Sequence, residues 1–105
     1  MIRHKVVCLI GSTRYFKEMA QVAHDLSLGG SIVLRPHVVK SQVFPRAPLS
    51  PEDRTRLDHI RYEEVELADE VYVLNIDGYM GESTSRQLAY ARSLGKPEVW
   101  HEPIT

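Results

Sequence analysis

The sequence has little of several features that would narrow its function at once. Only one of its 105 residues is cysteine, Cys8, so a disulfide framework or a cysteine-based zinc site within one chain is excluded. The 13 basic and 14 acidic side chains leave a net charge of −1, which provides no basic field for nucleic acid. No apolar run approaches the ~20 residues that cross a bilayer, and the short run before Gly11 is too brief for a signal peptide. We therefore expect a soluble cytoplasmic protein without a nucleic-acid or membrane partner.

Motifs for metals and for common cofactors are also missing. The five histidines are scattered without metal-ligand spacing. No Walker loop and no Gly-x-Ser-x-Gly elbow occurs, and Gly78-Tyr79-Met80-Gly81 falls short of a dinucleotide-binding fingerprint. We expect neither a metal ion nor a cofactor.

Short apolar runs alternate with helical patterns along the whole chain. Composition is that of an ordinary globular protein, and residues 1–105 are expected to form a single domain. Strands are predicted at residues 6–10, 31–35, 71–75 and 98–100, with helices over 16–28, 51–68 and 82–94. This alternation predicts an α/β fold, a Rossmann-like or flavodoxin-like three-layer arrangement with a parallel sheet of four to five strands in the order 2-1-3-4.

Apolar spacing predicts which helical side chains face the core. The residues expected on the buried faces are Phe16, Met19, Ala20, Ala23 and Leu26 in the first helix, Leu57, Ile60, Leu67 and Ala68 in the second, and Leu88, Ala91 and Leu94 in the third. Residues 36–51 include four prolines, which favours a long loop, either a lid or an interface.

Two loops follow neighbouring strands where the predicted strand order reverses, which is where open α/β sheets bind ligands. Residues 11–14 and 75–84 both lead into helix N-termini, whose free amide groups favour anions. Gly11 allows close backbone approach, and hydroxyl donors are supplied by Ser12, Thr13, Ser83 and Thr84. We expect a pocket for a small anionic or polyhydroxylated ligand such as a sugar phosphate. The alternative is that these hydroxyls only cap helices.

The other polar residues of these loops have a structural and a functional interpretation. Asp77 is either an Asx-turn residue or a carboxylate that binds a base or a sugar hydroxyl. Gln87 lies one helical turn after Ser83, so both are expected on one face near the helix start. Tyr15 and Tyr79 either stack on a base or cover the edge of the core.

Three separated motifs carry a resemblance to a known family. They are residues 8–16 with the Gly11-Ser12-Thr13-Arg14 turn, residues 68–71 running into 75–79, and residues 81–91 followed by Gly95-Lys96-Pro97. With these motifs the chain resembles the nucleoside 2-deoxyribosyltransferase superfamily, in particular its small bacterial and phage members. The resemblance implies cleavage of a nucleoside or nucleotide N-glycosidic bond, by base transfer or by hydrolysis. It also implies a homodimer or larger homo-oligomer.

The same resemblance implies roles for individual residues. The family's nucleophilic glutamate corresponds to Gln87, with Asp77 orienting the base or ribose. The residues expected to bind substrate are Gly11, Ser12, Thr13, Arg14, Tyr15, Asn75, Tyr79, Gly81, Glu82 and Ser83, with Ser83 serving a phosphate.

Glutamine at the nucleophile position has three competing explanations, because an amide carries no charge and is a very poor nucleophile. Glutamate was changed deliberately to trap a substrate, or the protein is a catalytically silent nucleotide-binding or sensing module, or another acid such as Asp77 or Glu82 reacts instead.

Overall fold

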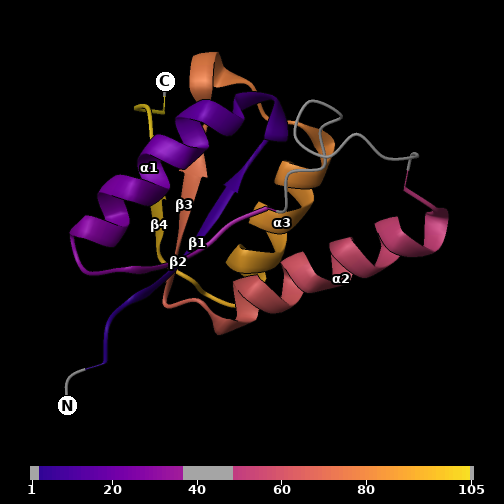
Figure 1. Cartoon of the computed structure of the whole chain (residues 1–105), viewed down its shortest axis with the longest axis horizontal. Helices are drawn as coiled ribbons and strands as arrows, with labels where there is room; N and C mark the ends of the chain where they lie inside the picture. The colour runs from indigo at the N-terminus through magenta and orange to yellow at the C-terminus, as the bar shows by residue number, and fades with distance from the viewer. Residues whose placement is uncertain (1–2, 37–48, 105) are drawn as a thin grey trace.

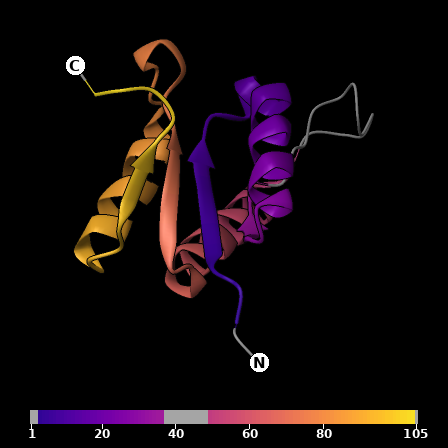
Figure 2. The ribbon, with the colours of Figure 1, turned by 90° about the vertical axis from the view of Figure 1, so that its left-hand side faces the viewer.

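The central element is a parallel sheet. The computed structural model describes residues 3–36 and 49–104, and within them four strands pair in the order β2-β1-β3-β4. Their bounds are β1 (Val6–Gly11), β2 (Ile32–Leu34), β3 (Glu70–Leu74) and β4 (Glu98–Trp100), and every pairing is parallel. Figure 2 shows the arrows of β1, β3 and β4 running in one direction. The predicted α/β class and strand order are confirmed.

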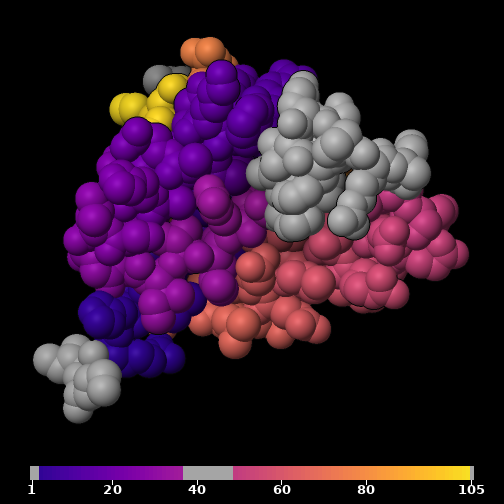
Figure 3. All heavy atoms as spheres, viewed as in Figure 1, coloured from indigo at the N-terminus to yellow at the C-terminus, as the bar shows by residue number. Residues whose placement is uncertain are grey.

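Three α-helices cover the two faces of this sheet. They are α1 (Phe16–Leu28), α2 (Pro51–Leu67) and α3 (Glu82–Ser93), and two short 3-10 helices, η1 (Thr13–Tyr15) and η2 (Ile76–Gly78), lie in the loops after β1 and β3. Helix α1 packs on one face, while α2 and α3 pack on the other (Figure 1). In the space-filling view of Figure 3, α1 and α2 occupy opposite halves of the visible surface. The arrangement has three layers, as predicted.

The core consists of two apolar clusters, one on each face of the sheet. Side chains of β1 alternate between them: Leu9 packs with Met19 of α1, whereas Cys8 and Ile10 pack with Val65 at the end of α2. All these side chains are essentially inaccessible. Full burial of one such aliphatic side chain contributes about 1.5–3 kcal/mol. Strand β1 is therefore buried on both faces, with the free Cys8 thiol inside the core.

Local sequence signals determine where two of the helices begin and end. At the start of α2 the Ser50 hydroxyl accepts a hydrogen bond from the Asp53 amide, and the Asp53 carboxylate accepts one from the Ser50 amide. This reciprocal capping, with Pro51 at the first helical position, fixes where the helix begins. At the end of α1, Gly30 has φ of +98°, a left-handed conformation that favours glycine.

The predicted burial was wrong at several helical positions. On α2, Ile60 and Leu67 are 43% and 67% exposed instead of facing inward. The buried residues of the helix are instead Arg61 and Val65. Ala68, at the C-cap of α2, is buried as predicted. Because Val65 and Ala68 sit over β1 and β3, they determine which face of α2 is buried.

Two further corrections concern the other helices. Ala20 of α1 is exposed, because Met19 and Val22 provide the contact with the sheet. Leu94 is exposed because it lies at the C-cap of α3, beyond its packed turns. The predicted loop falls mainly on residues 37–48, which lie outside the described residues. No helix in the described ranges is long and apolar enough to span a membrane.

Candidate functional site

A cavity of about 330 Å³ opens at the carboxyl end of the sheet, between the loop after β1 and the start of α3. Its lining brings together both loops that the sequence predicts, together with one residue of α2 and the proline that follows β2. The lining residues are Gly11, Ser12, Thr13, Pro36, Arg61, Tyr79, Gly81, Glu82, Ser83, Thr84 and Gln87. Among the residues predicted to bind substrate, Arg14, Tyr15 and Asn75 do not line it, nor does Asp77.

Gly11 lies where the neighbouring strand leaves no room for a side chain. It pairs with Leu74 in the β1–β3 ladder, and a β-carbon at this position would lie 2.9 Å from the Leu74 β-carbon. Real β-carbons do not approach so closely, so only glycine fits without displacement of β3. The next residue, Ser12, accepts a hydrogen bond from the Arg14 amide and so turns the chain into η1.

The first turn of α3 faces the cavity without a side-chain cap. Its N-cap is Gly81, which has no side chain to accept hydrogen bonds from the amides of the first turn. Ser83 and Thr84 lie in this first turn and line the cavity. Uncapped amides at the positive end of a 12-residue helix suit an anionic or strongly polar group.

Gln87 lies one turn further along α3, on the cavity wall. The residue is only 8% exposed, and its side-chain amide makes no hydrogen bond to another described residue. An amide held this way at a cavity surface has both donor and acceptor capacity left for a ligand.

Arg61 reaches the cavity from α2 and is buried, being 7% exposed. The last residue of β2, Leu34, pairs with Cys8 of β1. Beyond this pair, the Arg61 guanidinium donates a hydrogen bond to the carbonyl of the next β1 residue, Leu9, at 2.6 Å. It also forms an ion pair with Glu64 at 2.7 Å. Its Nε is buried and has no hydrogen-bond partner among the described residues.

Tyr79 forms one side of the cavity and is supported by two residues of the loop after β1. The guanidinium of Arg14 lies 4.1 Å from the centre of the Tyr79 ring, a cation–π contact. Tyr15 meets the same ring edge-on, with centroids 6.1 Å apart. Arg14 and Tyr15 therefore contact Tyr79, which lines the cavity, and do not line the cavity themselves.

Asp77 and Asn75 contact the C-terminal segment instead of the cavity. The Asn75 amide exchanges two hydrogen bonds with the backbone of Glu102, at 2.8 and 3.0 Å. The Asp77 amide donates to the Glu102 carboxylate at 3.1 Å, and Asp77 has φ of +53°, as aspartate in a tight turn can adopt. These contacts support the turn interpretation of Asp77.

Comparison with solved structures shows the same fold in a 2-deoxyribosyltransferase from the psychrotolerant bacterium Bacillus psychrosaccharolyticus. The TM-score is 0.71 at 22% sequence identity, and the alignment covers 95% of this chain and 77% of that chain. No protein-family model and no curated protein sequence matches this chain. At this identity, the likeness shows a shared fold.

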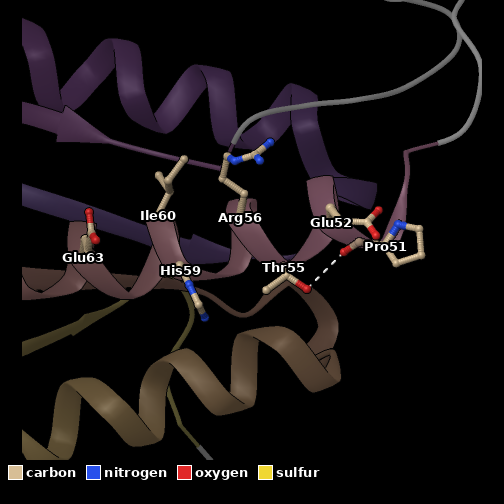
Figure 4. Close-up of a pocket in the computed structure, with 7 residues that line it drawn as sticks. All are labelled: Pro51, Glu52, Thr55, Arg56, His59, Ile60 and Glu63. Atoms are coloured by element: carbon tan, nitrogen blue, oxygen red, sulfur yellow. Dashed lines mark hydrogen bonds between the residues drawn. The ribbon is translucent and has the colours of Figure 1, made fainter.

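A second, more open hollow of about 570 Å³ runs along the outer side of α2. Figure 4 shows Arg56 and Ile60 pointing to one side of the helix and His59 to the other, so its polar groups do not converge. The drawn hydrogen bond, from the Thr55 hydroxyl to the Pro51 carbonyl, lies within the helix. None of the predicted site residues lines this hollow. The strand-end cavity is therefore the better candidate site.

Sequence reasoning missed two lining residues, Arg61 and Pro36. A signal for Arg61 was present, because Arg61, Val65 and Ala68 are spaced i, i+4 and i+7 and share a helix face. An arginine among apolar residues on an inward face indicates a buried charge with a specific partner. Pro36 had no comparable signal, since its place depends on where β2 ends.

Proposed function

We propose that this chain binds a nucleoside or nucleotide in the strand-end cavity, and that the site is built for N-glycosidic-bond chemistry at position 87. The observation that carries the proposal is Gln87, whose side-chain amide lies on the cavity wall beside the uncapped start of α3 and has no hydrogen-bond partner among the described residues. The fold shared with a 2-deoxyribosyltransferase supports the same ligand class. Residues 1–105 act here as one domain, and a homodimer or larger assembly is expected.

The proposed reaction needs a carboxylate at position 87. A carboxylate oxygen would form a bond to the anomeric carbon while the bond from that carbon to the base nitrogen breaks. The base leaves with the electron pair and takes up a proton from solvent. A nitrogen of a second base, or the oxygen of water, then bonds to the anomeric carbon and loses a proton while the bond to the carboxylate oxygen breaks, which restores the carboxylate. Gln87 has nearly the same shape but lacks the charge. The unchanged chain is therefore proposed to bind its ligand with little or no turnover.

The remaining lining residues are assigned to parts of the ligand. Gly11, Ser12 and Thr13 would contact the sugar or its 5′-phosphate, and Ser83 would bind that phosphate. Tyr79 would face the base. A catalytically silent nucleotide-binding module is the second candidate function, favoured by the neutral residue at position 87.

The test compares the unchanged chain with Gln87→Glu and follows free base released from a panel of deoxyribonucleosides, ribonucleosides and their 5′-monophosphates. Ser85→Glu is the matched control, because it adds the same carboxylate to α3 at an exposed position that does not line the cavity.

Release by Gln87→Glu alone is the expected result, and the best substrate would define the ligand class. Release by both the unchanged chain and the variant would transfer the chemistry to Glu82 or Asp77. Saturable binding without release by any form would favour the binding module. Neither binding nor release across the panel would refute the proposal.

A further inference from the structure

We propose that Arg61 makes the strand-end cavity selective for an anionic ligand, namely a phosphate monoester such as a nucleoside 5′-monophosphate. The inference rests on the proposed function, because it assigns the charge of the ligand at that same site. Arg61 is a specificity-determining residue here, since it acts on the ligand's charge and takes no part in the bond that breaks.

Arg61 brings a buried positive charge to the cavity. The side chain lines the cavity while being more than nine-tenths buried, so water screens its charge weakly. Its terminal nitrogens are held by the Leu9 carbonyl and by Glu64. Its Nε has no partner among the described residues, which leaves the guanidinium incompletely satisfied.

A single carboxylate pairs with Arg61, and it comes from outside the cavity lining. Cys8 lies 3.6 Å from the guanidinium, but burial raises the pKa of the Cys8 thiol, so at neutral pH the thiol is uncharged. Glu64 is therefore the only anionic group among the described residues that pairs with Arg61. Glu64 does not line the cavity.

The wall of the cavity carries little negative charge among the described residues. The only described carboxylate that lines it is Glu82, whose side chain is 88% exposed and paired with Arg86 at 2.8 Å. Gln87 is neutral and therefore adds no carboxylate to the wall. The uncapped amides at the start of α3 add partial positive charge on the same side. An anionic group on the ligand would therefore meet positive charge in the cavity, and the one described carboxylate of the wall, Glu82, is exposed and paired with Arg86.

The test measures Kd by titration calorimetry for the four common 2′-deoxyribonucleosides and their 5′-monophosphates. For each pair, the ratio of the nucleoside Kd to the monophosphate Kd gives the phosphate preference. The unchanged chain is compared with Arg61→Gln, which removes the charge, and Arg61→Lys, which keeps it. Glu64→Gln serves as the opposite perturbation, because it keeps an acceptor for Arg61 but removes the neutralising carboxylate.

We expect a ratio above about tenfold for the unchanged chain, since a close charge interaction at low effective dielectric is worth at least that much. The ratio should fall towards one in Arg61→Gln, persist in Arg61→Lys and rise in Glu64→Gln. A purely structural role for Arg61 would weaken both ligands alike and leave the ratio unchanged.

Nucleoside binding without phosphate preference in the unchanged chain would overturn this inference while leaving the proposed function intact. A falling ratio in Glu64→Gln would overturn it as well. If Arg61→Gln does not fold, the unchanged chain, Arg61→Lys and Glu64→Gln still decide the matter. Failure of every ligand to bind the unchanged chain would overturn the proposed function together with this inference.

Discussion

Replacing Gly11 with alanine tests how closely β1 and β3 approach beneath the cavity. The added β-carbon would lie 2.9 Å from the Leu74 β-carbon, and Leu74 is 1% exposed and fixed in the neighbouring strand. Favourable carbon contacts lie at about 3.5–4.0 Å, so the strands must separate locally by at least about 0.6 Å. Overpacking of this kind costs about 1–3 kcal/mol of unfolding free energy. A β-carbon cannot rotate away, so we expect Gly11→Ala to fall within this range.

The matched control is Gly29→Ala. Gly29 has φ of −78°, and an added β-carbon would meet only the carbonyl oxygens of Asp25 and Leu26, both at an ordinary 3.5 Å. Both substitutions reduce the entropy of the unfolded chain equally, so the difference between the variants isolates the native-state contact. Gly29→Ala is expected to be neutral or to stabilise the protein by up to about 1 kcal/mol.

Urea unfolding at pH 7 provides the assay for both variants. For a domain of this size, each 1 kcal/mol corresponds to a shift of about 4–8 °C in Tm, so thermal unfolding provides a second readout. Equal stability of Gly11→Ala and Gly29→Ala would refute the close approach of β1 and β3 at this point.

Asp69 and Lys96 lie at the amino end of the sheet, opposite the cavity, and each allows a smaller prediction. The Val6 amide donates a hydrogen bond to the Asp69 carboxylate at 2.8 Å, which lowers the pKa of Asp69 below its ordinary value of 3.8. The ionised carboxylate therefore stabilises the fold fully above pH 3.8, and this stabilisation is lost as the pH falls through the lower pKa of the folded state. The stability gap between the unchanged chain and Asp69→Asn, measured by urea unfolding, should therefore be larger at pH 6 than at pH 2.5; a constant gap would contradict this. Lys96 donates to two carbonyls at the end of α2, those of Glu66 and Ala68, so Lys96→Met should lose about 1–2 kcal/mol. Lys5→Met, which breaks only a 3.4 Å surface ion pair, should lose less than about 1 kcal/mol, and an equal loss in both variants would argue against the capping role.

The fold was predictable because its local signals agree with one another. The apolar run before Gly11 has no polar face, so it had to be a strand covered on both sides, and that in turn requires a parallel sheet with helices on both faces. The strong start signal at Ser50 and Pro51 then separates the second helix from the preceding segment.

The burial of α2 was not predictable from its apolar residues alone. Ile60 and Leu67 are larger than Ala68, yet they are exposed, because the contact with the sheet depends on which face fits against β1 and β3. Arg61 is buried on that face because β2 ends early and leaves the Leu9 carbonyl in need of a donor. Such a requirement arises only once the strands are paired.

The sequence predicted the location of the site better than the contacts of its individual residues. The strand-order reversal brings the loops after β1 and β3 together, and Gly11, Ser83 and Gln87 all line the resulting cavity. Asn75 and Asp77 lie in the right loop, but their contacts with Glu102 depend on the path of the C-terminal segment. Sequence spacing holds no information about that path.

Binding of a nucleoside or nucleotide in the strand-end cavity is tested most directly by thermal unfolding in the presence of a panel of these ligands. The unchanged chain is compared with Ser83→Trp, which fills the cavity from the first turn of α3, and Ser85→Trp, which adds the same side chain at an exposed position outside it. A ligand at 100 times its Kd should stabilise the unchanged chain and Ser85→Trp by about 2.7 kcal/mol and leave Ser83→Trp unaffected. Equal stabilisation of all three proteins would place the ligand elsewhere, and no stabilisation by any nucleoside or nucleotide would contradict the account.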